Sequence, residues 1–135
     1  KGAFNCVLAV LPILKAQKFG QIVLCASVAG YRGLPNSQPY GASKAAITAF
    51  GQSIAKSLAP HGIAVTTLAP GFVDTEMAAT LLDGPTGDDI RNQSPFGRVA
   101  NPEELARAIY FLASADAEWA SGAVLDFNGA SYLRM

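Results

Sequence analysis

The stretch QIVLCASVAGYRGLPNSQPYGASKAA, residues 21–46, decides the fold of this 135-residue chain. Residues 21–26 form a short continuous apolar run of the kind found in strands that are covered on both faces. Residues 27–39 are rich in Gly, Pro, Asn and Ser, which predicts a turn. Helical spacing of apolar residues then continues over 40–58. The stretch therefore predicts a buried parallel strand, a loop and a long helix.

Outward from this stretch, helical and strand patterns keep alternating. Apolar residues before it follow the spacing of a helix face, and β-branched residues after it indicate a second strand that Pro70-Gly71 stops. Asn101-Pro102-Glu103-Glu104 has the composition of a helix start. In chain order, we expect a helix over 2–18, strands over 21–26 and 63–68 on either side of the helix over 40–58, a mobile insertion over 74–95 with one short helix at 75–82, a helix over 102–112 and a strand over 122–127.

Strands that alternate with helices of this length are typical of parallel βαβ construction, so the fold class is α/β. A sheet of three parallel strands would expose an edge and part of a face that such sheets normally bury. We therefore expect residues 1–135 to be one incomplete domain whose first half is missing from this chain. No internal repeat or interdomain linker divides it.

Charge and cysteine content limit the classes of partner. Ten basic residues balance ten acidic ones, which argues against nucleic-acid binding and against attraction to an anionic membrane. The apolar run over 3–14 is interrupted and too short to span a bilayer. Cys6 and Cys25 lie in apolar stretches without a C-x-x-C spacing, so we expect buried free thiols in a reducing, cytoplasmic compartment and no metal site. The expected partner is a small molecule or another protein.

Three residues form the candidate catalytic set. Tyr40 and Lys44 are four positions apart on the expected helix, so their side chains share one face. A nearby ammonium favours the phenolate and moves a phenol toward acid–base chemistry at neutral pH. Ser27 follows the first strand directly, at the sheet edge where open α/β sheets place ligands. The geometry thus suits a proton transfer to or from a substrate oxygen.

Tyr-x-x-x-Lys alone is a weak signal, but it occurs here in a longer pattern. The string Ser27-Val28-Ala29-Gly30, the thirteen-residue step to Tyr40-Gly41-Ala42-Ser43-Lys44 and the later Pro70-Gly71-Phe72-Val73-Asp74-Thr75 occur together. In combination they resemble the short-chain dehydrogenase/reductase family. The resemblance covers essentially the whole chain and implies the C-terminal half of a Rossmann-like, doubly wound parallel sheet.

The resemblance also implies roles for individual residues. Tyr40 would exchange a proton with the substrate oxygen, Lys44 would assist it and bond the nicotinamide ribose, and Ser27 would orient the carbonyl or alcohol. Pro70, Gly71, Val73 and Thr75 would contact the carboxamide side of the nicotinamide. The implied enzyme is an NAD(P)-dependent oxidoreductase that interconverts a secondary alcohol and a ketone, with NAD or NADP as its cofactor.

One departure from the family pattern concerns the cofactor. None of the thirteen glycines belongs to a phosphate-binding G-x-G-x-x-G, so the adenosine half of the site is missing and this fragment alone should be inactive. The sequence consequently does not distinguish NAD from NADP. Asn5 lies several residues too late to be the family's catalytic asparagine, and we interpret it as an ordinary helix position.

Other functions compete with this interpretation. A truncated, non-catalytic binding or interaction module of the same family would keep the fold but not the reaction. A related isomerase or dehydratase would be expected to carry a longer substrate domain. Relatives associate through equivalent helices, so we expect a homodimer or homotetramer through helices 2–18 and 40–58. Tyr31, Leu34, Pro35 and residues 72–82 are the expected substrate contacts, whereas Trp119 and Phe127 are expected to be buried near the last strand.

Overall fold

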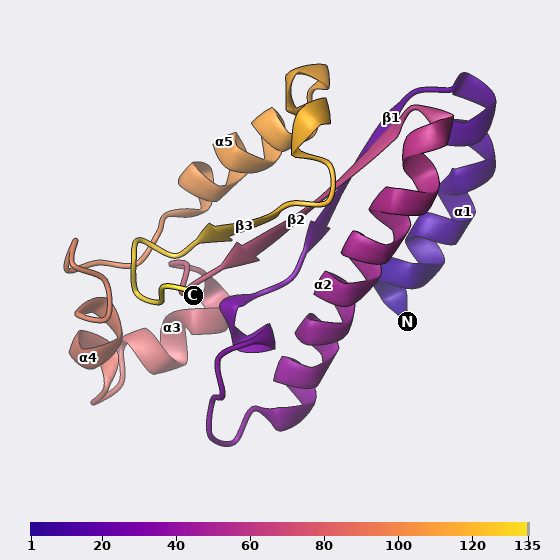
Figure 1. The fold of residues 1–135 in the computed structure, drawn as a ribbon. Coiled ribbons are helices and arrows are strands. Elements are labelled where there is room, and N and C mark those ends of the chain that lie inside the picture. The colour runs from indigo at the N-terminus through magenta and orange to yellow at the C-terminus, as the bar shows by residue number, and fades with distance from the viewer. Residues whose placement is uncertain (135) are drawn as a thin grey trace.

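A parallel sheet runs through the middle of the computed structural model, which describes residues 1–134 (Figure 1). Its strands are β1 (Gly20–Cys25), β2 (Ile63–Pro70) and β3 (Val124–Phe127), in the order β1-β2-β3. Both pairings are parallel, with Cys25 beside Leu68 and Pro70 beside Phe127. The carboxyl ends of all three strands therefore lie at one edge of the sheet.

Helices cover both faces of this sheet (Figure 1). The long helices α1 (Gly2–Gln17) and α2 (Gln38–Leu58) lie on one face, and α5 (Pro102–Leu112) with the 3-10 turn η3 (Ala115–Ala120) lies on the other. Short 3-10 turns η1 (Val28–Gly30) and η2 (Ala59–His61) flank α2. The segment after β2 forms α3 (Glu76–Leu82) and α4 (Gly87–Arg91) beyond the carboxyl edge of the sheet.

The core follows the alternation of side chains along the strands. Ile63 and Val65 of β2 face α1 and α2 together with Ile22 and Leu24 of β1, while Leu68 faces α5 and η3. Every residue of β2 is buried, as expected for the central strand of a covered parallel sheet. The separate cluster of Ala78, Leu82 and Ile90 holds α3 and α4 together.

The expected α/β fold class and parallel sheet are confirmed, and most element positions differ from expectation by one or two residues. Two details differ further. Residues 87–91 form α4, which the sequence did not predict because a five-residue helix is too short to show periodicity. The strand β1 is only partly covered, because its side chains alternate between buried and half-buried up to the exposed Cys25.

The prediction that both cysteines are buried is wrong, since Cys6 and Cys25 are both exposed free thiols. Cys6 lies on α1 next to the buried Val7, and the turn of the helix points it away from the core. Cys25 shares the less covered face of β1 with the half-buried Val23. Trp119 was also expected to be buried, yet it is 99% exposed at the end of α5 and η3.

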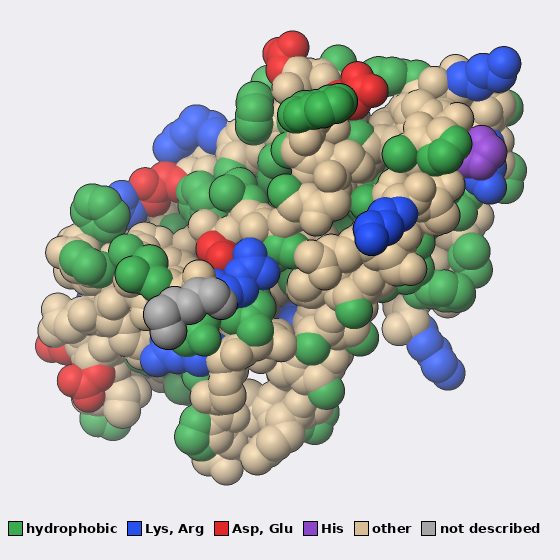
Figure 2. Space-filling model, in the orientation of Figure 1, with side chains coloured by type: hydrophobic (Ala, Val, Ile, Leu, Met, Phe, Trp, Pro, Cys, Tyr) green, Lys and Arg blue, Asp and Glu red, His purple; other side chains and the backbone are tan. Residues whose placement is uncertain are grey.

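The surface mixes charge with apolar side chains. Basic and acidic side chains are interspersed on the face shown in Figure 2, and hydrophobic side chains gather over α5 and the segment that follows it. Among the residues that the structure describes, no helix has the length and apolar character to cross a membrane.

Candidate active site

Ser27 lies at the carboxyl edge of the sheet, two residues beyond the end of β1. It is 9% exposed, and its hydroxyl accepts a hydrogen bond of 3.2 Å from the backbone amide of Ala29. Ser27 is thereby the N-cap of η1, the 3-10 turn that leads away from the sheet. A capped hydroxyl keeps its own proton available, so Ser27 can donate to a substrate oxygen from a fixed position.

Tyr40 and Lys44 occupy the first turns of α2. The ring of Tyr40 is 45% exposed, and the Lys44 Nζ lies 5.5 Å from the centre of that ring. The same Nζ donates a hydrogen bond of 3.0 Å to the backbone oxygen of Cys25, at the end of β1. Lys44 therefore links α2 to the strand that leads into Ser27, and the two side chains expected to cooperate share one face of α2.

Two glycines bring Ser27 and Tyr40 onto neighbouring surfaces. A Cβ at Gly30 would lie 2.8 Å from the backbone nitrogen of Ala45, and a Cβ at Gly41 would lie 2.9 Å from the backbone oxygen of Ala29. Both contacts are closer than side chains tolerate, so η1 rests directly on the backbone of α2. The structure thus places the turn that begins at Ser27 against the turn of α2 that carries Tyr40 and Lys44.

The expected cofactor turn begins at Pro70, the last residue of β2. Beyond it, Val73 forms a parallel bridge with Ala100, made by the amides of Asp74 and Ala100 at 2.8 and 3.2 Å. In a parallel bridge of this form the N–H of Val73 points to the opposite side. Thr75 turns its hydroxyl back toward the backbone oxygen of Val73 at 3.4 Å. An amide and a hydroxyl are thus adjacent at the end of β2.

Gly71 is required at this turn because β3 passes close by. Its amide donates to the backbone oxygen of Phe127 at 3.0 Å, and a Cβ at Gly71 would lie 2.9 Å from the Cβ of Asn128. Asn128 in turn donates from its side chain to the backbone oxygen of Tyr132 at 2.9 Å. The end of β3 therefore packs against the expected cofactor turn at Gly71. The sequence did not predict this contact.

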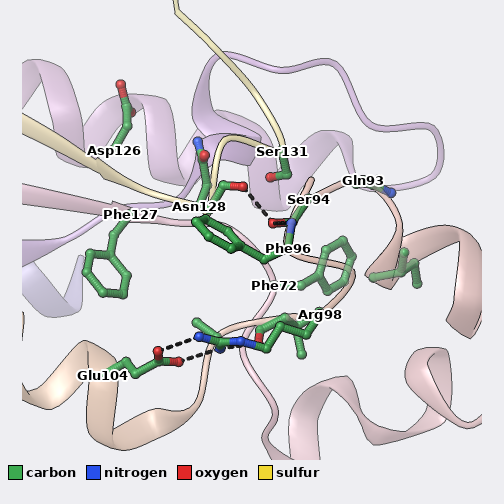
Figure 3. A pocket seen from close by; sticks show the side chains of 14 residues that line it. Phe72, Gln93, Ser94, Phe96, Arg98, Glu104, Asp126, Phe127, Asn128 and Ser131 are labelled. Carbon is green, nitrogen blue, oxygen red and sulfur yellow. Dashed lines mark hydrogen bonds and ion pairs between the residues drawn. The ribbon is translucent and has the colours of Figure 1, made fainter.

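A cavity of about 320 Å³ lies next to this turn (Figure 3). Its lining comes from Phe72, from the segment 90–100 and from the end of β3, and none of Ser27, Tyr40 and Lys44 belongs to it. In the close-up, the aromatic rings of Phe72, Phe96 and Phe127 surround the space, and the Ser94 hydroxyl donates to the backbone oxygen of Gly129. The cavity thus adjoins the turn after β2 and is separate from the three candidate catalytic side chains.

An ion pair between Arg98 and Glu104 closes one side of that cavity (Figure 3). Two guanidinium nitrogens lie 2.7 Å from the two carboxylate oxygens, and the Asn101 amide donates to the same carboxylate at 2.8 Å. The hydrogen bond from Arg98, followed by that from Asn101, lowers the pKa of Glu104 to about 2. The same pairing raises the pKa of Arg98. Both groups are thus charged at neutral pH.

Tyr31, an expected substrate contact, is engaged by the protein itself. Its hydroxyl donates to the Asp126 carboxylate, and its ring lies 5.6 Å from that of Tyr132. Burial, and then the hydrogen bond to Asp126, raises the pKa of Tyr31, so this phenol stays protonated. Sequence reasoning missed the contact because the two residues are 95 positions apart and no local pattern links them.

The segment 72–82, expected to contact substrate, contains both exposed and buried apolar side chains. Leu81 is 50% exposed on α3, with Met77 one turn before it, so both present apolar surface to the outside. Leu82 is 4% exposed and packs with Ala78 and Ile90. Leu82 is therefore core, which corrects the expectation that the whole segment contacts substrate.

Comparison with known proteins identifies the family of this chain. Residues 1–129 match the protein family described as enoyl-(acyl carrier protein) reductase. The 3-oxoacyl-[acyl-carrier-protein] reductase FabG of Haemophilus influenzae is 38% identical over 125 residues, which are 93% of this chain and 51% of the relative. FabG of Thermotoga maritima is 37% identical over 129 residues, 96% of this chain and 52% of the relative. The chain spans about half the length of the curated relatives it matches.

Solved structures give the same result. A gluconate 5-dehydrogenase of Burkholderia cenocepacia, in complex with NADP and tartrate, superposes with a TM-score of 0.91 at 32% identity over 98% of this chain and 53% of its own. The TT0495 protein of Thermus thermophilus superposes with a TM-score of 0.91 at 30% identity, over 96% of this chain and 55% of its own. Sequence match, fold and the arrangement of the carboxyl edge agree, and the chain belongs to the short-chain dehydrogenase/reductase family.

Proposed function

We propose that this chain is the catalytic C-terminal half of an NAD(P)-dependent oxidoreductase that interconverts a secondary alcohol and a ketone. One observation carries the proposal: the Lys44 ammonium lies 5.5 Å from the Tyr40 ring and bonds the backbone oxygen of Cys25, two residues before Ser27. A phenol, a cation and a hydroxyl thus surround one end of the sheet. This is the chemistry that a proton transfer to or from a substrate oxygen needs.

Each residue has a separate task in this reaction. In the reducing direction, the proton of the Tyr40 hydroxyl passes to the carbonyl oxygen of the substrate, and in the oxidising direction the phenolate takes the alcohol proton. Lys44 stabilises the negative charge that the phenol oxygen carries between these states. Ser27 donates to the substrate oxygen and holds it near the phenol. When bound, the nicotinamide cofactor supplies or accepts the hydride.

The described residues fit the nicotinamide end of such a cofactor. The amide of Val73 points away from its bridge to Ala100, and the Thr75 hydroxyl donates to the Val73 oxygen, so an amide donor and a hydroxyl acceptor are available to a carboxamide. Pro70 and Gly71 form the floor of the turn, and Lys44 can reach a ribose hydroxyl from α2. The choice between NAD and NADP belongs to residues outside this set.

The substrate class follows from the relatives only in outline. FabG relatives are named as 3-oxoacyl-[acyl-carrier-protein] reductases, and one structural neighbour is a gluconate 5-dehydrogenase. Both names describe a carbonyl or secondary alcohol within a larger molecule. A 3-oxoacyl thioester is therefore the first substrate to assay, and the exposed Met77 and Leu81 of α3 are the side chains proposed to contact its chain.

The proposal extends to the oligomeric state of the protein and to its location in the cell. We propose a homodimer or homotetramer through α1 and α2, because Phe4 and Leu8 of α1 are half exposed and Phe4 packs against Phe50 of α2, 5.3 Å between ring centres. Apolar side chains exposed along a helix, as here on α1, are typical of a contact between subunits. A cytoplasmic location agrees with the free thiols of Cys6 and Cys25.

The experiment that tests the proposal replaces Tyr40 by Phe in the complete natural protein, whose intact mass first establishes its length. We expect turnover of an acetoacetyl thioester with NADPH or NADH to fall by about a thousandfold or more, since the proton donor is gone. Affinity for the cofactor, measured by fluorescence titration, should remain. Tyr110→Phe, on an exposed side chain of α5, is the matched control. Retained turnover in Tyr40→Phe would contradict the proposal.

A further inference from the structure

A side chain of β3, the strand at the other edge of the sheet from β1, holds the loop that follows Ser27. Tyr31 is the C-cap of η1, and its hydroxyl donates to one oxygen of the Asp126 carboxylate. The other oxygen of Asp126 takes an ion pair of 3.2 Å from Arg134, whose guanidinium lies 5.1 Å from the centre of the Tyr31 ring. We call these three residues the Tyr31 clamp.

The clamp is connected to Ser27 by a turn with little freedom. The amide of Gly30 donates to the backbone oxygen of Ser27 at 3.0 Å, and the amide of Tyr31 donates to that of Val28 at 3.1 Å. Gly30 itself rests on the backbone of α2 at Ala45. The turn from Ser27 to Tyr31 is therefore held by α2 on one side and by Asp126 at its end.

Asp126 lies at the edge of the cavity, where its carboxylate can reach the loop. It lies on β3 beside Ala69 of β2, one residue before the start of the cofactor turn at Pro70. In Figure 3 its side chain points away from the aromatic rings of the cavity. Its two oxygens are bound by Tyr31 and Arg134. Asp126 therefore belongs to the cavity lining, but its carboxylate binds the loop.

We propose that Asp126 and Tyr31 are positioning residues for Ser27, holding the turn that presents the Ser27 hydroxyl to the substrate oxygen. The inference rests on the proposed function. Stability alone does not account for the clamp well, because the Asp126 and Arg134 side chains are 26% and 37% exposed. Ion pairs at such exposure contribute little to folding. Loss of the clamp should consequently appear in catalysis more than in stability.

The experiment uses Tyr31→Phe, Asp126→Asn and the double variant in the complete natural protein, with an acetoacetyl thioester and NADPH as probes. Each single variant should lose about tenfold in kcat while KM for NADPH stays unchanged, because the clamp acts on the Ser27 hydroxyl and not on the cofactor. The double variant should lose no more activity than the more impaired single variant, since both substitutions act on the same contact between Tyr31 and Asp126. Additive losses, or wild-type kinetics in both single variants, would overturn the inference.

Matched controls separate positioning from general damage. Tyr110→Phe and Asp116→Asn make the same chemical changes at exposed positions of α5 and η3, and both should keep wild-type kinetics. If Tyr31→Phe fails to fold, Arg134→Gln replaces it, because it keeps the hydrogen bond of the Tyr31 hydroxyl and removes the contacts of the guanidinium with Asp126, the Tyr31 ring and the Val124 oxygen. A reduced kcat in Arg134→Gln would support the inference, and an unchanged one would overturn it.

Amide hydrogen exchange gives a readout that needs no turnover. The amides of Gly30, Tyr31 and Arg32 donate within the turn, so Asp126→Asn should make them exchange about tenfold faster while β2 amides keep their protection. Unchanged exchange at these three amides would overturn the inference. A wild-type protein without reductase activity would contradict the proposed function instead, and the exchange result would still decide whether the clamp holds the turn.

Discussion

Glu104 connects two elements through one carboxylate. It accepts hydrogen bonds from Arg98, in the segment that lines the cavity, and from the backbone amide of Asn101 at the start of α5. The second contact is half of a capping box, which satisfies an amide that the helix leaves without an internal partner. The sequence predicted the helix start from Asn101, Pro102 and Glu104. It did not predict Arg98 as a partner, because the bend between them is a tertiary feature.

This carboxylate gives the protein a specific acid sensitivity. Its pKa of about 2 lies below the ordinary value of about 4.3 for an unfolded chain. A lowered pKa means that the stabilisation is present above the unfolded value and is lost as the pH falls toward 2. The free energy of unfolding of the wild type minus that of Glu104→Gln, measured by urea denaturation, should therefore shrink between about pH 5 and pH 2. Glu103→Gln is the control, and a constant difference across this range would contradict the prediction.

In α3, the adjacent residues Leu81 and Leu82 should respond differently to truncation. Leu82→Ala should lower the free energy of unfolding by ~2–4 kcal/mol, because it opens a hole beside Ala78 and Ile90. Leu81→Ala should cost less than about 1 kcal/mol, since its side chain is half exposed. In the complete enzyme, Leu81→Ala should instead change the ratio of kcat/KM between short and long 3-oxoacyl thioesters. Equal losses of stability in both variants would contradict this division.

At the scale of elements, the packing of η1 on α2 decides whether Ser27 faces Tyr40. Gly30→Ala would push a methyl group against the backbone at Lys44 and Ala45, which cannot move without shifting the helix. We expect the free energy of unfolding to fall by ~1–3 kcal/mol. We also expect kcat to fall by a larger factor than KM for the cofactor rises. Gly33→Ala is a matched control in the same loop, because nothing lies within 4 Å of the added Cβ. Equal behaviour of the two variants in melting and kinetics would refute the contact.

Most elements could be predicted from the sequence because their periodicity is strong. The apolar run before Ser27, the helical spacing after Tyr40 and the β-branched run before Pro70 each belong to an element of at least six residues. The site could be predicted as far as it lies within these elements. Contacts that bring distant loops together, such as Tyr31 with Asp126 and Gly71 with Asn128, depend on the final packing and have no local signature. The same limit explains why the exposure of Cys25 and Trp119 was misjudged.

At the scale of the molecule, assembly through α1 and α2 can be tested directly. Leu8→Glu places a charge on the half-exposed apolar face next to Phe4, so a dimer that buries this face should dissociate. Light scattering with size-exclusion chromatography of the complete protein should show a lower mass for the variant. Met77→Glu makes the same type of change on the exposed surface of α3 and should keep the wild-type mass. An unchanged mass for Leu8→Glu would place the interface elsewhere.

The open side of β1 has a consequence for how the protein can be assembled. Within residues 1–134, β1 pairs only with β2, so its other side presents a ladder of main-chain donors and acceptors. Hydrogen bonds between strands use main-chain groups, so a separate polypeptide that carries a strand could pair with the open edge of β1. Such pairing would extend the sheet without a covalent link between the two polypeptides. When no other strand pairs with it, the open edge of β1 can pair with that of a second copy, so the polypeptide produced by itself should be prone to self-association.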